Sequence, residues 1–494
     1  MSELWQQWLP GQELGSYVAG QVVAGSGDRV ELVDPATGTL LDGYADGGAS
    51  VVDQGVQAAQ EGGRAWRAMT ASDRGRALFA VGALVREHLE PLATLEATVA
   101  GKPLRDCRVE IGKVAEMFEY YAGWADKQHG EVIPVPTTHL NYTLREPYGV
   151  VAQMTPWNAP VFTAGWQLAP ALAAGNAVVL KPSELTPVSS VVLARLVERA
   201  GVPVGAVNVI AGLGPTAGQR LVGHPGIGKV VFVGSPATGR RIAATAADQL
   251  TPCVLELGGK SANIVFADAD LSRAVGGAAA AIFSAAGQSC VAGSRLLVQR
   301  TAYDEVVSRV ADLAARITVG HPLAESTQVG PLQNQRQLEQ VTRLVSAATD
   351  GSATAAHGGA PVDLDGGFYY PPTVLAGVDN ADDIAQTEVF GPVVAVIPFD
   401  DEEHAVALAG DTAYGLAGAV WTGSVDRAHR VARQVRAGTV WINSYKTISV
   451  MSPFGGFGDS GYGRSSGRDG LAEYTQAKSV WCETAADAPL PFGY

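Results

Sequence analysis

The stretch from 149 to 184, GVVAQMTPWNAPVFTAGWQLAPALAAGNAVVLKPSE, decides how this chain folds. Its apolar runs predict a buried strand at 149–154, a helix at 161–174 and a second strand at 177–181. Strands that are apolar throughout and separated by helices are typical of a parallel sheet covered on both faces. Ligands of such sheets bind at the carboxyl ends of the strands, where the polar residues of TPWN and KPSE fall.

The same alternation extends along most of the chain and predicts an α/β protein. The further predicted strands are 207–210, 229–233 and 253–257, and the helices between them are 187–200, 215–222 and 236–247. A second alternation runs from 264 to about 440, and the segment 64–121 is mostly helical. Between them, VIPVPTTHLNYTLREP at 132–147 predicts an extended hairpin whose prolines suit an edge or interface element better than a core strand.

Composition excludes several classes of protein. The chain has 494 residues, enough for two or three domains, with 47% apolar and 17% charged residues. Its net charge of −14 argues against nucleic-acid or membrane-surface partners, which need clustered Lys and Arg. No apolar run is long enough to cross a membrane, and 1–20 lacks the features of a secretory signal, so we expect a cytoplasmic protein.

Cysteine and histidine spacing argues against disulfides and metals. The four cysteines lie far apart with no CxxC pair, which predicts free thiols. The eight histidines are scattered and form no HExxH, so we expect no metal site.

Three polar residues are candidates for catalysis. Cys290 lies in the turn GQSC, whose polar and glycine residues suit an accessible nucleophile in surroundings that favour a thiolate; a buried structural thiol is the alternative. Glu256 ends an apolar strand before Gly258–Gly259, which allow backbone close to a ligand; it is either a desolvated general base or the ion-pair partner of Lys260. Asn158 is either an oxyanion donor or the cap of the following helix.

Cofactor signals follow the strands. Lys181 and Glu184 end a strand at the ligand-binding edge, where a carboxylate suits an adenosine ribose and repels a 2′-phosphate; a charged loop at a helix start is the alternative. The segment 232–239 reads as strand, glycine turn and helix, which suits a pyrophosphate at a helix N-terminus, and 212–215 is a weaker glycine turn.

Together these segments resemble the aldehyde dehydrogenase superfamily over almost the whole chain. The motifs, in the family's order, are MTPWN (154–158), KPSE (181–184), FVGS with GxxxxG (232–239), ELGGK (256–260), GQSC (287–290), EVFGPV (388–393), YGLAG (414–418) and SPFGGFGDSGYGR (452–464).

The resemblance implies two doubly wound parallel-sheet domains and a small β arm. The cofactor domain would comprise 1–131 and 148–257, the catalytic domain 258–467, and the oligomerisation arm 132–147 and 468–494, of which 485–494 is a flexible or docking tail. Family members are usually homodimers or homotetramers.

The resemblance also implies a reaction: NAD-dependent oxidation of an aldehyde to its acid, with NAD favoured over NADP. Cys290 would form a thiohemiacetal and then a thioester, Asn158 would hold the oxyanion, and Glu256 would activate water. The residues implied to bind the cofactor are Thr155, Pro156, Trp157, Lys181, Ser183, Glu184, Gly214, Gly218, Phe232, Gly234, Ser235, Gly239, Leu257, Glu388 and Phe390.

Positions in the resemblance also suggest the wall of a substrate tunnel. The expected wall residues are Phe162, Trp166, Ile448, Met451 and Phe454, an apolar lining suited to an apolar aldehyde. Lys446 near the mouth is expected to be a solvated loop lysine, with a preference for an acidic substrate as the alternative.

Three other functions compete with hydrolytic oxidation. A CoA-acylating enzyme would not need Glu256 as a base. An inactive cofactor-binding scaffold would not need Cys290, Glu256 and Asn158 together, and a plain thiol esterase would have no use for Lys181, Glu184 and Glu388.

Overall fold

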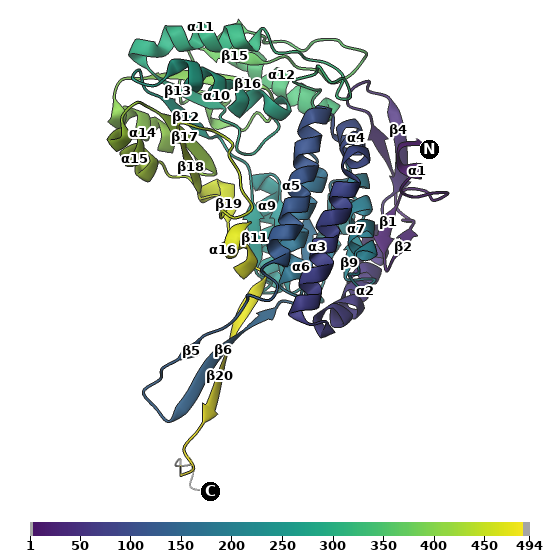
Figure 1. Ribbon diagram of the computed structural model, residues 1–494. Helices are drawn as coiled ribbons and strands as arrows, with labels where there is room; N and C mark the ends of the chain where they lie inside the picture. The colour runs from purple at the N-terminus through teal and green to yellow at the C-terminus, as the bar shows by residue number, and fades with distance from the viewer. Residues whose placement is uncertain (1–2, 488–494) are drawn as a thin grey trace.

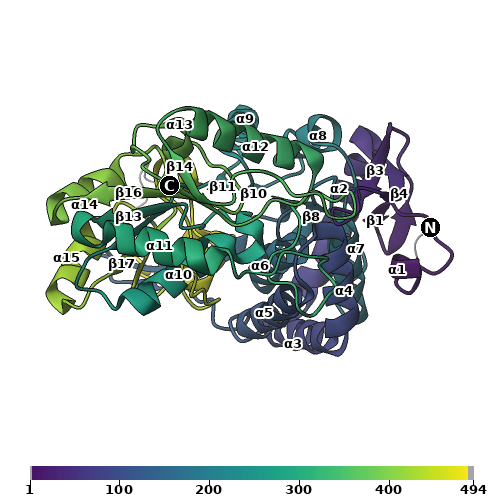
Figure 2. The same cartoon turned by 90° about the horizontal axis from the view of Figure 1, so that it is seen from above.

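The computed structural model describes residues 3–487 and contains two sheets flanked by helices, with a slender arm projecting from them (Figure 1). Figure 2 shows the helices and strands of the two sheets side by side. The arrangement confirms the predicted α/β class.

The first sheet has eight strands in the order β19-β11-β10-β7-β8-β9-β1-β2. Its parallel strands are β7 (Val150–Met154), β8 (Ala177–Lys181), β9 (Val207–Val209), β10 (Lys229–Val233) and β11 (Cys253–Glu256). The antiparallel edge strands are β19 (Gly461–Tyr462), β1 (Ser16–Val18) and β2 (Gln21–Val23). The strand β7 lies at the centre and all five of its residues are buried, Gln153 included, as its largely apolar character predicts.

Helices cover both faces of this sheet. The helices that pack on its strands are α2 (Gly48–Ala68), α6 (Pro160–Ala173), α7 (Val188–Arg199) and α9 (Pro236–Asp248). The helices α3 (Ala71–Glu87), α4 (Leu89–Ala100), α5 (Leu104–Ala122) and α8 (Gln219–Val222) pack mainly on these helices and on one another. The predicted helix at 215–222 is in fact a π-helical turn, Gly214–Gly218, followed by the short α8. Helix α5 packs on α3, α4 and α6, and this contact sets its position beside the site described below.

The second sheet has seven strands in the order β14-β15-β16-β13-β12-β17-β18, and only the edge strand β14 is antiparallel. Its strands are β12 (Ala262–Val265), β13 (Arg295–Gln299), β14 (Thr354–His357), β15 (Thr373–Ala376), β16 (Val393–Phe399), β17 (Ala417–Trp421) and β18 (Thr439–Ile442). Its helices are α10 (Leu271–Phe283), α11 (Tyr303–Ala314), α12 (Gln335–Asp350), α13 (Asp383–Gln386), α14 (Glu402–Gly410) and α15 (Val425–Gln434).

The predicted hairpin forms a three-stranded arm with a strand from the far end of the chain. Strand β6 (His139–Pro147) pairs with β5 (Val132–Ile133) and with β20 (Thr475–Glu483), in register from Thr475 opposite Pro147 to Glu483 opposite His139. The arm stands clear of both sheets (Figure 1). Residues 488–494 of the expected tail lie outside the described residues.

The remaining elements are α1 (Glu3–Gln6), β3 (Arg29–Val33), β4 (Leu40–Ala45) and α16 (Gly467–Ala472). The strand β19 pairs with β11 of the first sheet. Within residues 3–487, no helix combines the length and apolar character needed to cross a bilayer, and no group of three or more His, Cys, Asp or Glu side chains is placed to hold a metal. All four cysteines are free thiols.

Candidate active site

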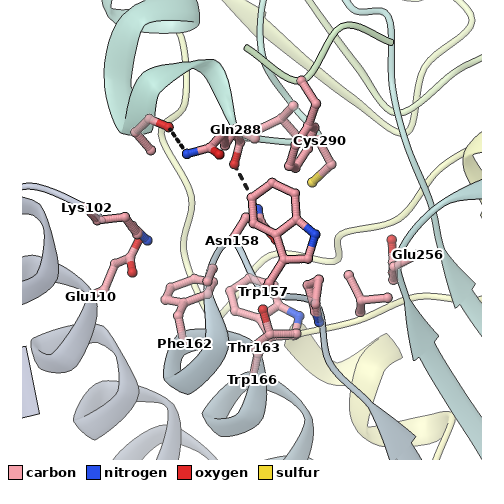
Figure 3. A pocket seen from close by; sticks show the side chains of 18 of the residues that line it. Lys102, Glu110, Trp157, Asn158, Phe162, Thr163, Trp166, Glu256, Gln288 and Cys290 are labelled. Atoms are coloured by element: carbon pink, nitrogen blue, oxygen red, sulfur yellow. Dashed lines mark hydrogen bonds and ion pairs between the residues drawn. The ribbon is translucent and has the colours of Figure 1, made fainter. Parts of the chain in front are cut away.

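A cavity of about 770 Å³ brings together residues of the first sheet, of α5, α6 and α12, and of the loops that connect the strands of the second sheet. Figure 3 shows part of its wall, with Cys290 and Glu256 on one side of Asn158 and the Lys102–Glu110 pair on the other. The sequence-predicted residues that line it are Pro156, Trp157, Asn158, Phe162, Trp166, Glu184, Gly234, Ser235, Glu256, Leu257, Cys290, Glu388, Phe390, Ile448 and Phe454.

Eight predicted residues do not line this cavity: Thr155, Lys181, Ser183, Gly214, Gly218, Phe232, Gly239 and Met451. Gly239 packs against Leu257 of the wall, and Gly218 packs against the stem of Lys181, which does not line the cavity. The prediction that Met451 lines the tunnel wall is not met, because this residue is 67% exposed and Val450 lines the cavity instead. A one-residue shift in an irregular loop reverses which side chain points inward, and no periodic pattern in the sequence fixes that shift.

The turn before Cys290 has an unusual backbone. Ala285, Ala286 and Gly287 have consecutive φ values of 55°, 53° and 70°. A Cβ on Gly287 would lie 2.0 Å from the carbonyl oxygen of Gly391, so only glycine fits there. Alanine rarely adopts positive φ, and such strain is found where the surrounding structure imposes it, often at functional sites.

The thiol of Cys290 is partly exposed to the cavity, which rules out the buried structural thiol. Burial, followed by the carboxylates of Glu388 and Glu256, raises its pKa to about 12, whereas Lys446 lowers it. The expectation of surroundings that favour a thiolate is therefore not met in this structure. Glu388 and Glu256 have raised pKa values themselves, so protonation of either one relieves its repulsion of the thiolate.

Glu256, at the end of β11, is 5% exposed, and burial raises its pKa to about 8. The hydroxyl of Ser465 donates a hydrogen bond of 2.9 Å to Oε1, which opposes this rise. The other oxygen, Oε2, is buried without a hydrogen-bond partner among the described residues. The Lys260 ion pair considered from the sequence is not formed, and a carboxylate with a raised pKa and one free oxygen suits a general base.

Asn158 lies between β7 and α6. Its Nδ2 donates a 2.9 Å hydrogen bond to the carbonyl oxygen of Gln288, two residues before Cys290 (Figure 3). The residue that caps α6 is Ala159, with no side-chain cap, so the capping alternative for Asn158 is wrong. Gln288 is itself held by the backbone N–H of Gln333, which donates to its Oε1 at 2.9 Å. This chain of contacts fixes the amide of Asn158 beside the turn that carries the thiol.

Glu388 explains the glycine pair at 258–259. Its Oε1 accepts a 3.1 Å hydrogen bond from the backbone N–H of Gly259, and a Cβ on Gly258 would lie 2.1 Å from Oε2. A Cβ on Gly259 would lie 2.4 Å from the carbonyl oxygen of Cys290. The glycines were expected to let backbone approach a ligand. In this structure their missing side chains leave room for the carboxylate of Glu388 and for the backbone of Cys290.

The other end of the cavity is polar. Ser235 caps α9, its hydroxyl accepting a hydrogen bond from the backbone N–H of Thr238, and with Gly234 it places the N-terminus of this helix at the cavity wall. Glu184 lines the same end, with a carboxylate oxygen 3.8 Å from the buried ammonium of Lys181. A helix N-terminus and a half-exposed carboxylate are groups that bind a phosphate and a ribose, respectively.

Sequence reasoning missed one wall of the cavity. A single face of α5 supplies Asp106, Val109, Glu110, Lys113, Glu116 and Met117. Their three- and four-residue spacing is visible in the sequence, but the packing of α5 on α6 that turns this face inward joins segments far apart in the chain. Ser465 and Gln288 were missed for the same reason.

Comparison with known proteins identifies the family to which a chain with this site belongs. The profile of the aldehyde dehydrogenase family matches residues 22–480. The chain belongs to the aldehyde dehydrogenase family. Its relatives in this family include (Z)-2-((N-methylformamido)methylene)-5-hydroxybutyrolactone dehydrogenase of Acinetobacter baylyi, 41% identical over 97% of this chain and 98% of that protein. Betaine aldehyde dehydrogenase of Bacillus subtilis is 38% identical over 95% and 97% of the two chains.

Solved structures of aldehyde dehydrogenases have the same fold. The NAD+ complex of the Bacillus cereus aldehyde dehydrogenase superposes with a TM-score of 0.95 at 39% identity, covering 98% of this chain and 99% of that one. The predicted resemblance and fold are thus confirmed.

Proposed function

We propose that the chain oxidises an aldehyde to its carboxylic acid with NAD, through a thioester on Cys290 that water hydrolyses. The observation that carries this proposal is the presence in one cavity of the thiol of Cys290, the amide of Asn158 and the carboxylate of Glu256. The NAD complex of the Bacillus cereus relative supports the choice of cofactor.

The described residues fit NAD. The N-terminus of α9, with Gly234 and Ser235, would hold the pyrophosphate, and Glu184 would accept hydrogen bonds from the adenosine ribose. A carboxylate at this position repels the 2′-phosphate of NADP. NAD supplies the acceptor for the hydride that leaves the substrate.

The residues of the chain divide the reaction between them. The Cys290 thiolate attacks the aldehyde carbon, and the Asn158 amide together with the Cys290 backbone N–H donates hydrogen bonds to the oxygen that becomes negative. After the hydride has left, the acyl group is joined to Cys290 as a thioester. Glu256 takes a proton from water as the water attacks this thioester, which releases the acid and the thiolate.

The test is NADH formation from a panel of aliphatic, aromatic and carboxylated aldehydes, with no CoA present. We expect NADH and the free acid in equal amounts, and faster turnover with NAD than with NADP. An absolute requirement for CoA, with acyl-CoA as product, would favour the acylating alternative. Faster turnover with NADP would contradict the role of Glu184.

Ser465→Ala tests the environment of Glu256. Losing the hydroxyl that donates to Oε1 raises the pKa of Glu256, so a larger fraction of the base is protonated at neutral pH. We expect the acid limb of the kcat profile to move to higher pH, with kcat at pH 7 reduced roughly three- to tenfold, the range for one hydrogen bond. An unshifted limb would mean that Glu256 does not limit turnover.

The arm suits a homo-oligomer, dimer or tetramer. It stands clear of both sheets, and it carries exposed apolar side chains at Val132 (73%), Leu140 (45%), Leu144 (42%) and Trp481 (55%). Exposed apolar groups on an isolated arm favour burial against another copy. Multi-angle light scattering should give two or four chains for each particle, and Leu144→Asp should lower that number. A monomeric wild type would contradict the proposal.

The cytoplasmic location of the protein stays a prediction.

A further inference from the structure

Lys446 is held at the cavity wall by its own loop. Its neighbours Tyr445 and Ile448 pack in one apolar cluster with Cys290, and Lys446 lines the cavity between them. The indole N–H of Trp441 donates a 3.0 Å hydrogen bond to the carbonyl oxygen of Thr447, and the rings of Trp441 and Tyr445 lie 4.8 Å apart. The lysine is therefore not a residue of a freely solvated loop, which was the expectation from the sequence.

The backbone of this loop is strained at the lysine itself. Lys446 has a φ of 56° and Asn443 a φ of 50°. Lysine has no local reason to adopt the left-handed region, so the packing of Trp441 and Tyr445 imposes it. The result is a lysine held by its backbone at the cavity wall, where its ammonium interacts electrostatically with Cys290 and Asp106.

The other charges near Lys446 already have partners. On the α5 wall, Glu110 pairs with Lys102, Glu116 with Lys113 at 2.6 Å, and Asp106 with Arg105 at 3.4 Å. Figure 3 shows the Lys102–Glu110 pair on the same side of the cavity as Phe162. Among the described residues, Lys446 forms no ion pair or hydrogen bond. Arg336 also lines the cavity and forms no ion pair among the described residues, but it lies exposed on α12, beside Gln337, whose side chain donates a hydrogen bond to the carbonyl oxygen of Phe390.

We propose that Lys446 binds the carboxylate of aldehydes that carry one, so that the preferred substrates are semialdehydes of dicarboxylic acids. The inference rests on the proposed aldehyde oxidation and names its substrate class. The apolar side chains of Phe162, Trp166 and Phe454 line the same cavity and would contact the carbon chain between the two groups. An ammonium without a protein partner gains a charge-assisted hydrogen bond only when such a substrate binds.

The preference depends on the charge of Lys446. Burial lowers its pKa to about 8, so the ammonium is present below this pH and is lost as the pH rises through it. The charged or titratable groups that face Lys446 are Cys290, Asp106, Lys102 and Glu110. A substrate carboxylate stays ionised throughout this range, so the preference should fade above about pH 8.

Matched pairs of aldehydes test the proposal. The pairs are 4-carboxybenzaldehyde with benzaldehyde, and glutarate semialdehyde with pentanal. We expect kcat/KM to favour the carboxylated member by roughly 10- to 100-fold, as for other charge-assisted contacts. Because both members use the same thiol and base, their ratio cancels the titration of Cys290 and Glu256. Lys446→Met should abolish the ratio, and Lys446→Arg should keep most of it.

Lys113→Met is the matched control, because Lys113 lines the same cavity but is already paired with Glu116. It should leave the ratio as it is in the wild type. A wild-type enzyme that forms NADH without preferring the carboxylated member would overturn the role of Lys446 and leave the proposed function standing. If Lys446→Met lowered both members of a pair equally, the lysine would act on the thiol, and the inference would again be wrong. No NADH from any neutral or carboxylated aldehyde would instead contradict the proposed function.

Discussion

Cys290→Ala abolishes NADH formation from every aldehyde that the wild type oxidises, with kcat/KM reduced by roughly 10⁴-fold or more. The reason is that no other cysteine lines the described cavity, so nothing replaces the thioester. Stopped-flow absorbance of NADH is the measurement, because it also detects a single turnover. The variant should still bind NAD, since the thiol is not among the groups proposed to hold the cofactor. Quenching of tryptophan fluorescence on addition of NAD measures this binding.

Cys253→Ala is the control for this variant. Cys253 begins β11, at the opposite end of the strand from Glu256, and its thiol is only partly exposed. We expect turnover close to that of the wild type. Activity surviving in Cys290→Ala but lost in Cys253→Ala would remove Cys290 as the nucleophile.

Glu256→Gln is expected to slow release of the acid by roughly 10²- to 10⁴-fold, the usual contribution of a general base. Glutamine keeps the shape of the side chain and its contact with Ser465 but cannot take a proton from water. The first turnover should still produce one NADH for each site, followed by a slow steady state. Intact-protein mass spectrometry should then show the acyl group attached to Cys290.

Two further observations would separate this role from a structural one. Hydroxylamine, a nucleophile that needs no general base, should restore release of the acyl group in Glu256→Gln. In the wild type, kcat should rise with pH through about 8, because the carboxylate is the active form and burial raises its pKa to that value. Steady turnover in Glu256→Gln without an acyl adduct would exclude Glu256 as the base.

Most of the first sheet could be predicted from the sequence because its strands are largely apolar and alternate with helical segments. The predicted strands at 177–181 and 229–233 coincide with β8 and β10, and those at 149–154 and 253–257 each exceed the observed strand by one residue. The antiparallel edges could not be predicted in this way. Strand β19 has two residues, and it joins β11 only through contacts between distant parts of the chain.

The candidate site was predictable where a motif carries the residue itself, as at Cys290, Glu256 and Asn158. It was not predictable where contacts between distant parts of the chain determine which side chains line the cavity. The close approach of Glu388 to Gly258, the inward face of α5 and the positive φ values of Ala285 and Ala286 all depend on segments distant in sequence. Lys446 shows the same limit, since only the packing of Trp441 and Tyr445 distinguishes it from an ordinary loop lysine.

The pairing of β20 with β6 also constrains how the chain folds during synthesis. Both β6 and β11 have left the ribosome long before residues 461–483 are made, and these late residues supply β19 and β20. Until then, one edge of the first sheet and one edge of the arm remain open to any other strand. Such exposed edges invite pairing with another nascent chain, so the time between translation of β6 and translation of β20 is the period in which this protein is most prone to aggregate.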